Sequence, residues 1–195
     1  GCYGRPVRVP DSTTNFLMVG TLEPRKGHSQ VLAAFEQLWD RGDQVSLVVA
    51  GKRGWLTDEL CNTIEEHPEF NRRLFWFPRA SDLQLRQLYR DCQCLIAASW
   101  DEGFGLPLVE AAREGLNLLV RDIEVFREVA GDHATYFTAE DDQSLAAAIV
   151  RWHERYKSGE LPDPGRLRWH DWGASANQLA NCIFGHVMEA GRIAE

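Results

Sequence analysis

The sequence has no long hydrophobic run and no excess of positive charge. Its 195 residues carry 21 Lys and Arg against 29 Asp and Glu, which gives a formal net charge of -8 at pH 7. No apolar stretch approaches the roughly 20 residues that span a bilayer, and the amino terminus does not resemble a signal peptide. The acidic balance argues against a broad basic surface for nucleic acid or an anionic membrane. Any anion site must therefore be small and directional.

Metal-binding and disulfide patterns are also missing. The six histidines form no H-x-x-H or H-x-x-x-H pair, and the five cysteines include no C-x-x-C pair. An odd, scattered set of cysteines predicts neither a disulfide framework nor a zinc site. We therefore expect no bound metal, and thiols that are buried and reduced. The cysteines are Cys2, Cys61, Cys92, Cys94 and Cys182.

The sequence does contain a regular alternation of short apolar runs and longer amphipathic segments. This alternation is typical of βαβ units around a parallel sheet. We expect an α/β fold, a Rossmann-like doubly wound parallel sheet of about six strands with helices on both faces. The expected strands are residues 15–20, 45–51, 73–78, 94–99, 117–122 and 134–138, and the expected helices are 28–42, 57–70, 81–92, 107–114, 124–131 and 142–159.

Local signals mark where several of these helices begin. Thr57 and Ser81 are suitable N-caps for the second and third helices. The long helix near the end of the sheet region is expected to have Asp142 or Ser144 as its cap. Pro107 is the natural first residue of its helix, because its missing N–H would be unpaired there in any case.

Composition divides the chain into three parts. Residues 1–14 are rich in turn formers and are expected to be a linker or the start of an excised piece, and residues 15–160 form the main domain. Residues 161–195 contain a break rich in Pro and Gly and a last helix over 174–189. Trp169 and Trp172 flank this break. They either hold the last helix on the domain or face another part of the protein.

The first unusual loop is "GTLEPRKGH", residues 20–28, between the first strand and its helix. In an open α/β sheet, ligands bind beyond the carboxyl ends of the strands. Arg25 and Lys26 place two cations just before a helix N-terminus, and Gly20 and Gly27 permit tight turns with exposed amides. A diphosphate suits this combination, and an ordinary solvated turn is the alternative.

The second unusual loop is "SWDEGFGLPLVEAA", residues 99–112. The amides of Gly103, Phe104 and Gly105 are expected at a helix N-terminus, with little side chain to prevent close approach. Glu102 precedes the loop and Glu110 lies about one turn into the helix, so we expect the two carboxylates to bracket an anion-sized pocket. Carboxylates repel phosphate but accept hydrogen bonds from hydroxyls. A nucleotide-sugar would satisfy all of these groups.

Together the two loops resemble the carboxyl-terminal half of the family-four retaining glycosyltransferases (glycosyl transferases group 1), which have the GT-B fold. The pattern Gly-Thr-x-x-x-Arg-Lys-Gly starts at Gly20, and Glu-Gly-Phe-Gly-Leu-Pro starts at Glu102, with Glu110 closing an E-x7-E pattern. Residues 81–99 and 121–132 match the same family. The resemblance covers about residues 16–180, and the combination of motifs is specific.

The resemblance implies that residues 15–160 are a Rossmann-like domain that binds a nucleotide-sugar donor. Arg25 and Lys26 would neutralise the diphosphate and stabilise it as the leaving group, which makes them catalytic together with Glu102. Glu102 would contact hydroxyls of the transferred sugar, and Glu110 would bind the ribose. The other donor-binding residues that we expect are Gly20, Thr21, Gly51, Lys52, Arg79, Gly103, Phe104, Gly105 and Leu106.

The resemblance also implies a reaction and partners. Such enzymes transfer a hexose with retention of configuration to a glycan or lipid-linked acceptor, which an amino-terminal domain binds. This chain lacks that domain, so we expect little or no turnover from it alone, and its last helix could pack on the missing half. The motifs look most like bacterial surface-polysaccharide mannosyltransferases, which favours GDP-mannose over a UDP-sugar as donor.

The same resemblance bears on cofactors and location. We expect no cofactor, no nucleic acid and no direct membrane insertion. The expected location is cytoplasmic, with peripheral contact to the inner membrane through the rest of the protein.

The sequence departs from the family pattern at three positions, and its motifs also bear on other possible functions. Asn117 stands where proline is common, Arg121 where a small residue is common and Pro78 near a usual glycine, which bears on base and sugar specificity. A glycoside hydrolase would need two carboxylates but not the cations or the amide loop. A dehydrogenase is disfavoured because no G-x-G-x-x-G follows the first strand. A non-catalytic nucleotide-sugar-binding or interaction module remains open.

Overall fold

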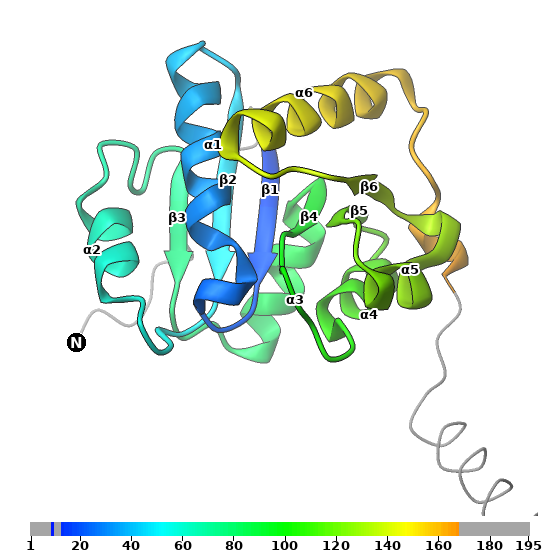
Figure 1. The fold of residues 1–195 in the computed structure, drawn as a ribbon, viewed down its shortest axis with the longest axis horizontal. Coiled ribbons are helices and arrows are strands. Elements are labelled where there is room, and N and C mark those ends of the chain that lie inside the picture. Colours follow the sequence, from blue (N-terminus) through cyan, green and yellow to red (C-terminus); the bar gives the residue numbers. More distant parts are fainter. Residues whose placement is uncertain (1–8, 10–12, 168–195) are drawn as a thin grey trace, which may run out of the picture.

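The computed structural model of the chain describes Val9 and residues 13–167. Six strands form one sheet in the order β3-β2-β1-β4-β5-β6, and every neighbouring pair is parallel (Figure 1). This is the strand order of a doubly wound dinucleotide-binding fold, so the expected fold class is confirmed. The strands are β1 (Thr14–Val19), β2 (Val45–Ala50), β3 (Leu74–Phe77), β4 (Cys94–Ala97), β5 (Asn117–Arg121) and β6 (Thr135–Phe137).

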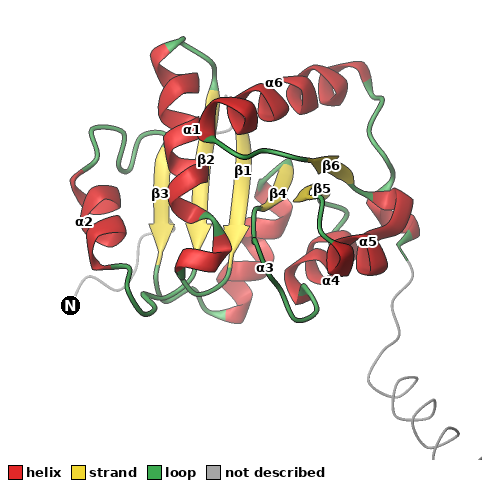
Figure 2. Ribbon diagram, in the orientation of Figure 1, coloured by secondary structure: helices red, strands yellow, loops and turns green. Residues whose placement is uncertain are grey.

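Helices cover both faces of the sheet (Figure 2). Two separate hydrophobic clusters lie on the two sides of the sheet, one under α1, α2 and α6 and the other under α3, α4 and α5. The chain therefore passes from β1 onto one face and from β4 onto the opposite face. The helices are α1 (His28–Asp40), α2 (Asp58–Glu66), α3 (Asp82–Asp91), α4 (Leu106–Arg113), α5 (Glu124–Ala130) and α6 (Asp142–Ser158), with short 3-10 turns η1 (Pro24–Lys26), η2 (Gly131–His133) and η3 (Pro164–Arg166).

The central strands are apolar on both sides because both sides are covered. Phe16 of β1 belongs to the cluster under α1 and α6, whereas its neighbour Leu17 belongs to the opposite cluster. Successive side chains of a strand point to opposite faces, so a continuous apolar run is what a sheet covered on both faces needs. The Phe16 ring meets Phe35 of α1 and Trp152 of α6 edge-on, at centroid distances of 5.5 and 5.0 Å. These contacts join α1 and α6 to the middle of the sheet.

Most of the expected helix starts are close to the observed ones. Ser81 caps α3 in a reciprocal capping box with Gln84, as the sequence predicts. The cap of α6 is Asp141, so the expectation of Asp142 or Ser144 was wrong by one residue, although Ser144 completes the capping box. The assignment failed because Asp141, Asp142 and Ser144 can each serve as a cap, and sequence alone does not say which has extended backbone.

Helices α2 and α4 differ from their expected boundaries. Thr57 does precede α2, but its hydroxyl donates to the carbonyl of Gly54 and makes no cap bond. The helix ends at Glu66 and not near residue 70, because His67 precedes a proline and is extended. Helix α4 begins at Leu106, one residue before the expected Pro107.

The ends of the chain are described only in part. Pro164 and Leu167 are buried against the domain, so the start of the Pro- and Gly-rich break packs on the body of the fold. Trp169, Trp172 and the expected last helix over 174–189 lie outside the described residues, as does most of the expected linker. The described part of the chain therefore leaves the two alternatives for the tryptophans open.

The sequence predicts buried, reduced cysteines, no bound metal and no membrane-spanning segment. Cys61, Cys92 and Cys94 are buried free thiols, while Cys2 and Cys182 lie outside the described residues. Within Val9 and residues 13–167, no group of three or more His, Cys, Asp or Glu side chains could hold a metal ion. Among the described helices, none combines the length and apolar character that crossing a bilayer requires.

His28, the first residue of α1, is buried without hydrogen-bond partners. Its side chain is 4% exposed, and neither ring nitrogen has a partner among the described residues. Burial, with a smaller contribution from the charge of Lys26, lowers the pKa of His28 from 6.5 to about 4. The folded protein therefore holds a neutral imidazole at pH values where the unfolded chain is protonated.

This burial predicts a specific loss of stability in acid. Between pH 6.5 and about 4 the unfolded state binds more protons at residue 28, so the free energy of unfolding falls as the pH falls. The full effect is about 3 kcal/mol. Urea unfolding across this range should show a shallower fall for His28→Leu than for wild type. His153, whose pKa burial also lowers, is present in both proteins and cancels. Parallel pH profiles would contradict the prediction.

Candidate functional site

The strand order brings together the two loops that the sequence singles out. Strands β1 and β4 are neighbours, and the chain leaves them on opposite faces of the sheet. The crevice between such diverging connections is where open α/β sheets bind ligands. Loop 20–27, after β1, and loop 98–105, after β4, form the two sides of this crevice. Both lead directly into helices, α1 and α4.

Glycines allow these loops to approach each other's backbones. Gly27 has φ +73°, and a Cβ there would lie 2.5 Å from the carbonyl oxygen of Ala98. A Cβ at Gly51 would lie only 1.8 Å from the carbonyl oxygen of Gly20. The glycine at position 51 therefore lets the loop after β2 pack directly against the loop after β1. This packing requirement is independent of the donor contact that the sequence predicts for Gly51.

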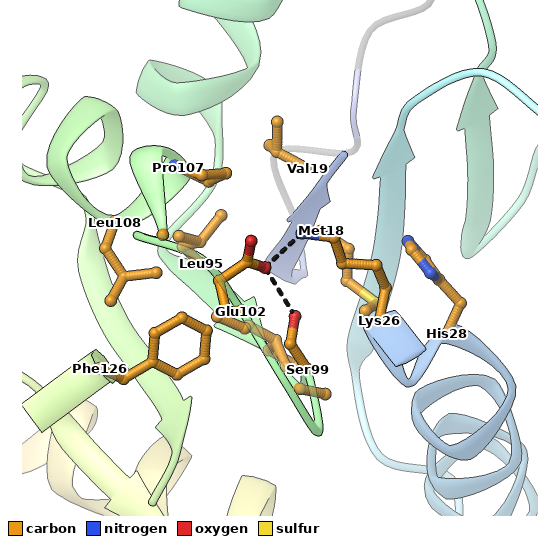
Figure 3. A pocket seen from close by; sticks show the side chains of 14 residues that line it. Met18, Val19, Lys26, His28, Leu95, Ser99, Glu102, Pro107, Leu108 and Phe126 are labelled. Atoms are coloured by element: carbon orange, nitrogen blue, oxygen red, sulfur yellow. Dashed lines mark hydrogen bonds and ion pairs between the residues drawn. The ribbon is translucent and has the colours of Figure 1, made fainter. Parts of the chain in front are cut away.

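The side chains of both loops meet in an ion cluster around Glu102. The Lys26 ammonium donates to one carboxylate oxygen of Glu102, and the Ser99 hydroxyl donates to the same oxygen at 3.2 Å (Figure 3). The second oxygen lies 3.6 Å from Arg25 Nη1 and accepts from the Gly103 amide at 3.3 Å. The three residues predicted to be catalytic are therefore in direct contact.

Arg25 links the two loops through its backbone as well as its guanidinium. Its Nε donates to Glu23 at 2.9 Å and its Nη1 donates to the carbonyl of Asp101 at 3.0 Å. In return, the amide of Trp100 donates to the carbonyl of Arg25 at 2.8 Å. These bonds hold the guanidinium beside Glu102 before any ligand binds.

The ion cluster is only partly open to solvent. The side chains of Lys26 and Glu102 are 14% and 13% exposed, whereas Arg25 is 42% exposed. Burial alone would raise the pKa of Glu102, but the hydrogen bond and charge of Lys26 outweigh it, and the pKa lies below its ordinary value. Glu102 is therefore ionised at neutral pH. Arg25 also pairs with Glu23 and Lys26 pairs with Glu102, so two carboxylates balance the two cations in the free protein.

The amide loop leads into α4 as expected. Gly105 is the N-cap of α4 and has no side chain to accept the amides of the first turn. Phe104 and Leu106 are 54% and 55% exposed, so their side chains point away from the core. Pro107 has no N–H and the amide of Leu108 donates to the carbonyl of Gly105 at 2.9 Å, so it is chiefly the dipole of α4 that favours an anion at this end.

Glu110 lies apart from this cluster. The cavity beside Lys26 and Glu102 is lined by residues of both loops and by Phe126, and Glu110 does not line it. Instead, Glu110 lies in a second hollow, between α3 and α4, where Tyr89 donates a hydrogen bond to it at 2.8 Å. The two glutamates therefore do not bracket one pocket, because the side chain of Glu110 projects from α4 toward α3.

The remaining predicted donor-binding residues lie on the same edge of the sheet. Thr21 follows Gly20 in the loop after β1, and the next amide, that of Leu22, donates to the carbonyl of Lys52 at 2.9 Å. This bond joins the loops after β1 and β2. Lys52 and Arg79 are exposed in the loops after β2 and β3. Their side chains are on the rim of the site rather than in the ion cluster.

The sequence did not predict a role in the site for several residues that the structure places there. His28 and Ser99 line the cavity with Lys26 and Glu102, and Ser99 is the last residue of the fourth expected strand, which was an available signal. Tyr89 is 4% exposed, and burial followed by the charge of Glu110 raises its pKa, so it remains a hydrogen-bond donor. Arg121 was noted only as a departure from the family pattern.

Comparison with known proteins gives relatives for most of the chain. A mannosyltransferase of Escherichia coli, described as serotype-specific mannosyltransferase WbdA, is 46% identical over 165 residues, covering 85% of this chain and 20% of that protein. The GDP-mannose:cellobiosyl-diphosphopolyprenol alpha-mannosyltransferase of Xanthomonas oryzae pv. oryzae is 30% identical, covering 74% of this chain and 38% of that protein. The chain thus spans about a fifth of the length of WbdA.

A solved structure and a sequence family complete the comparison. The C-terminal domain of the glycosyl transferase group 1 family protein LpcC of Francisella tularensis superimposes with a TM-score of 0.64 at 16% identity, covering 75% of this chain and 78% of that chain. At this identity the likeness shows a shared fold. The family described as Glycosyl transferases group 1 matches residues 5–162. Because this match covers most of its residues, the chain belongs to the glycosyl transferases group 1 family.

Proposed function

We propose that the chain is the donor-binding part of a glycosyltransferase and that it binds a nucleotide-sugar in the crevice between β1 and β4. The observation that carries this proposal is the cluster of Arg25, Lys26 and Glu102 beside the start of α4. Cations and the positive end of a helix dipole in one crevice suit a diphosphate, and a carboxylate in the same place suits sugar hydroxyls.

In the proposed reaction, Arg25, Lys26 and Glu102 exchange their contacts with one another for contacts with the ligand. In the free protein Glu102 neutralises part of the charge of Lys26 and Arg25. A diphosphate would take over hydrogen bonds from both cations, and Glu102 would turn toward hydroxyls of the sugar. As the bond between sugar and diphosphate breaks, negative charge grows on the leaving oxygen. Cations that are already in place stabilise that charge without further reorganisation.

GDP-mannose is the donor that we propose, with a UDP-sugar as the alternative. Support comes from the names of the relatives, which are mannosyltransferases, one of them named for GDP-mannose. The product would be a bacterial surface polysaccharide, with mannose transferred to a glycan or lipid-linked acceptor. No cofactor is proposed.

The rest of the proposed reaction involves parts of the protein beyond these residues. We propose transfer with retention of configuration, an acceptor site on a preceding domain, and little activity from this chain by itself. The proposed location is cytoplasmic, with contact to the inner membrane through other parts of the protein. A non-catalytic nucleotide-sugar-binding module is the second candidate, and transfer activity in a longer protein that contains both halves would exclude it.

The first prediction from this proposed function concerns the diphosphate. Calorimetry should detect binding of GDP, and Lys26→Gln should weaken it by about 1.5–3 kcal/mol, roughly 10- to 100-fold, because a charged hydrogen-bond donor is lost. Lys157→Gln, an exposed change at the far end of α6, is the control and should leave the affinity unchanged. No binding of GDP, UDP or ADP by the wild type at millimolar concentration would overturn the proposed function.

The second prediction concerns the ribose. Glu110→Ala should weaken GDP binding by about 1.5–3 kcal/mol through lost hydrogen bonds to ribose hydroxyls. Wild type should bind GDP more tightly than 2′-deoxy-GDP, and Glu110→Ala should remove this difference. Glu128→Ala, an exposed glutamate on α5, should keep it. If Glu110→Ala discriminates between the two nucleotides as wild type does, Glu110 is not the ribose residue.

The third prediction concerns the donor. In a thermal-shift panel at equal concentrations, GDP-mannose should raise the unfolding temperature more than UDP-glucose, UDP-galactose or ADP-glucose, because the tighter ligand stabilises the folded state more. The shift with GDP alone gives the contribution of the nucleotide, and the difference between GDP-mannose and GDP gives that of the sugar. A larger shift with a UDP-sugar would reverse the choice of donor without affecting the diphosphate site.

A further inference from the structure

Arg121, the last residue of β5, is a buried cation with an unusual set of partners. The residue is 4% exposed, and its guanidinium donates to the carbonyls of Ala98 and Ala139 at 3.0 and 2.7 Å and to the side chain of Gln30. The three acceptors come from the loop after β4, the segment after β6 and the first turns of α1. One side chain therefore joins three segments that are far apart in the sequence.

Aromatic rings complete the surroundings of this guanidinium. It stacks on Trp100 at 3.6 Å from the ring centroid and lies 5.2 Å from the Phe137 ring. Among the described residues, no carboxylate lies within ion-pair distance of Arg121. Buried arginines are normally paired, so the charge here is satisfied by carbonyl oxygens and by the faces of aromatic rings. That arrangement depends on the planar, forked shape of the side chain.

The contacts of Arg121 lead directly to the ion cluster. Ala98 and Trp100 flank Ser99 and stand just before Glu102 in the loop after β4. The amide of Trp100 donates to the carbonyl of Arg25, and the carbonyl of Ala98 faces Gly27. Arg121 thus contacts two residues that are themselves in contact with the loop of the two cations.

We propose that Arg121 is a positioning residue that fixes the loop after β4, and through it the relative placement of Glu102 and Arg25, before a ligand binds. Its effect on loop order stands on the contacts alone, whereas its effect on nucleotide affinity rests on the proposed function. Lysine cannot replace it, because an ammonium lacks the fork that reaches three acceptors and the plane that stacks on Trp100. A small residue at this position would leave the carbonyl of Ala98 and one face of the indole without these contacts.

The test combines a measurement without ligand and a measurement with ligand. Hydrogen exchange on the free protein should show the hydrogen-bonded amides within residues 99–106, those of Trp100 and Gly103, exchanging at least about tenfold faster in Arg121→Met and in Arg121→Lys than in wild type, since the contacts that anchor the loop are lost. GDP affinity should fall at least about tenfold in the same variants, because misplacing a binding group by a small distance is costly. Arg127→Met is the matched control.

Arg127 suits this purpose because it also lies over an aromatic ring, that of Tyr136, at 3.7 Å, and pairs with Asp122, but it does not contact the loop after β4. Its replacement should leave exchange of residues 99–106 unchanged. Trp100→Leu is a second variant that does not disturb the core, because Trp100 is 51% exposed. Like Arg121→Met, it should speed exchange over residues 99–106 and weaken GDP binding. The variant that carries both changes should differ little from either single variant.

The outcomes separate the proposal from its alternatives. Wild-type exchange over 99–106 in Arg121→Met or Trp100→Leu would overturn it, as would faster exchange spread evenly over the whole domain, which would indicate a purely structural role. Full rescue by Arg121→Lys would show that charge, not geometry, is what matters, and would overturn it too. If wild type binds no nucleotide, the proposed function fails, and the exchange measurement still decides the role of Arg121.

Discussion

Strands β1 and β4 pair in parallel through Phe16 with Cys94 and Leu17 with Leu95, although a large part of the sheet region separates them in the sequence. Their connections then leave on opposite faces, so no helix of residues 13–167 covers the gap between the two strand ends. The helices that follow, α1 and α4, both begin at this gap, and their N-terminal dipoles favour negative charge there. The position of the ion cluster, the amide loop and the cavity all follow from this one pairing.

Glu102 has a physical role in the free protein whatever its role toward a ligand. Two cations held close together in a crevice repel each other, and Glu102 offsets this repulsion by accepting from Lys26 and facing Arg25. The side chains that would otherwise be mobile are thereby ordered before binding. A ligand that enters such a site loses less free energy to ordering it, which is the general advantage of preorganisation.

Local pattern was enough to predict the six strands, the fold class and the placing of both unusual loops at one edge of the sheet, because the carboxyl ends of parallel strands share that edge. The rest depends on which helix faces pack together. Nothing local indicates that Tyr89 of α3 would contact Glu110 of α4. Arg121 lies near the end of an apolar strand, and the sequence marks it only as a departure from the family pattern. Only the tertiary structure supplies the three acceptors that allow its burial.

The sequence suggested that Glu102 and Glu110 bracket one pocket, but Glu110 lies apart from the ion cluster. This separation agrees with the shape of the proposed ligand. A nucleoside diphosphate is extended, with its ribose beyond the phosphates rather than between them. One short helix, α4, can serve both parts, since its first turn faces the crevice while Glu110, one turn later, faces α3. Because Tyr89 holds one oxygen of Glu110, the carboxylate is oriented before binding. The rigid α4 therefore sets the distance between the charge that would receive the diphosphate and the acceptor that would receive the ribose.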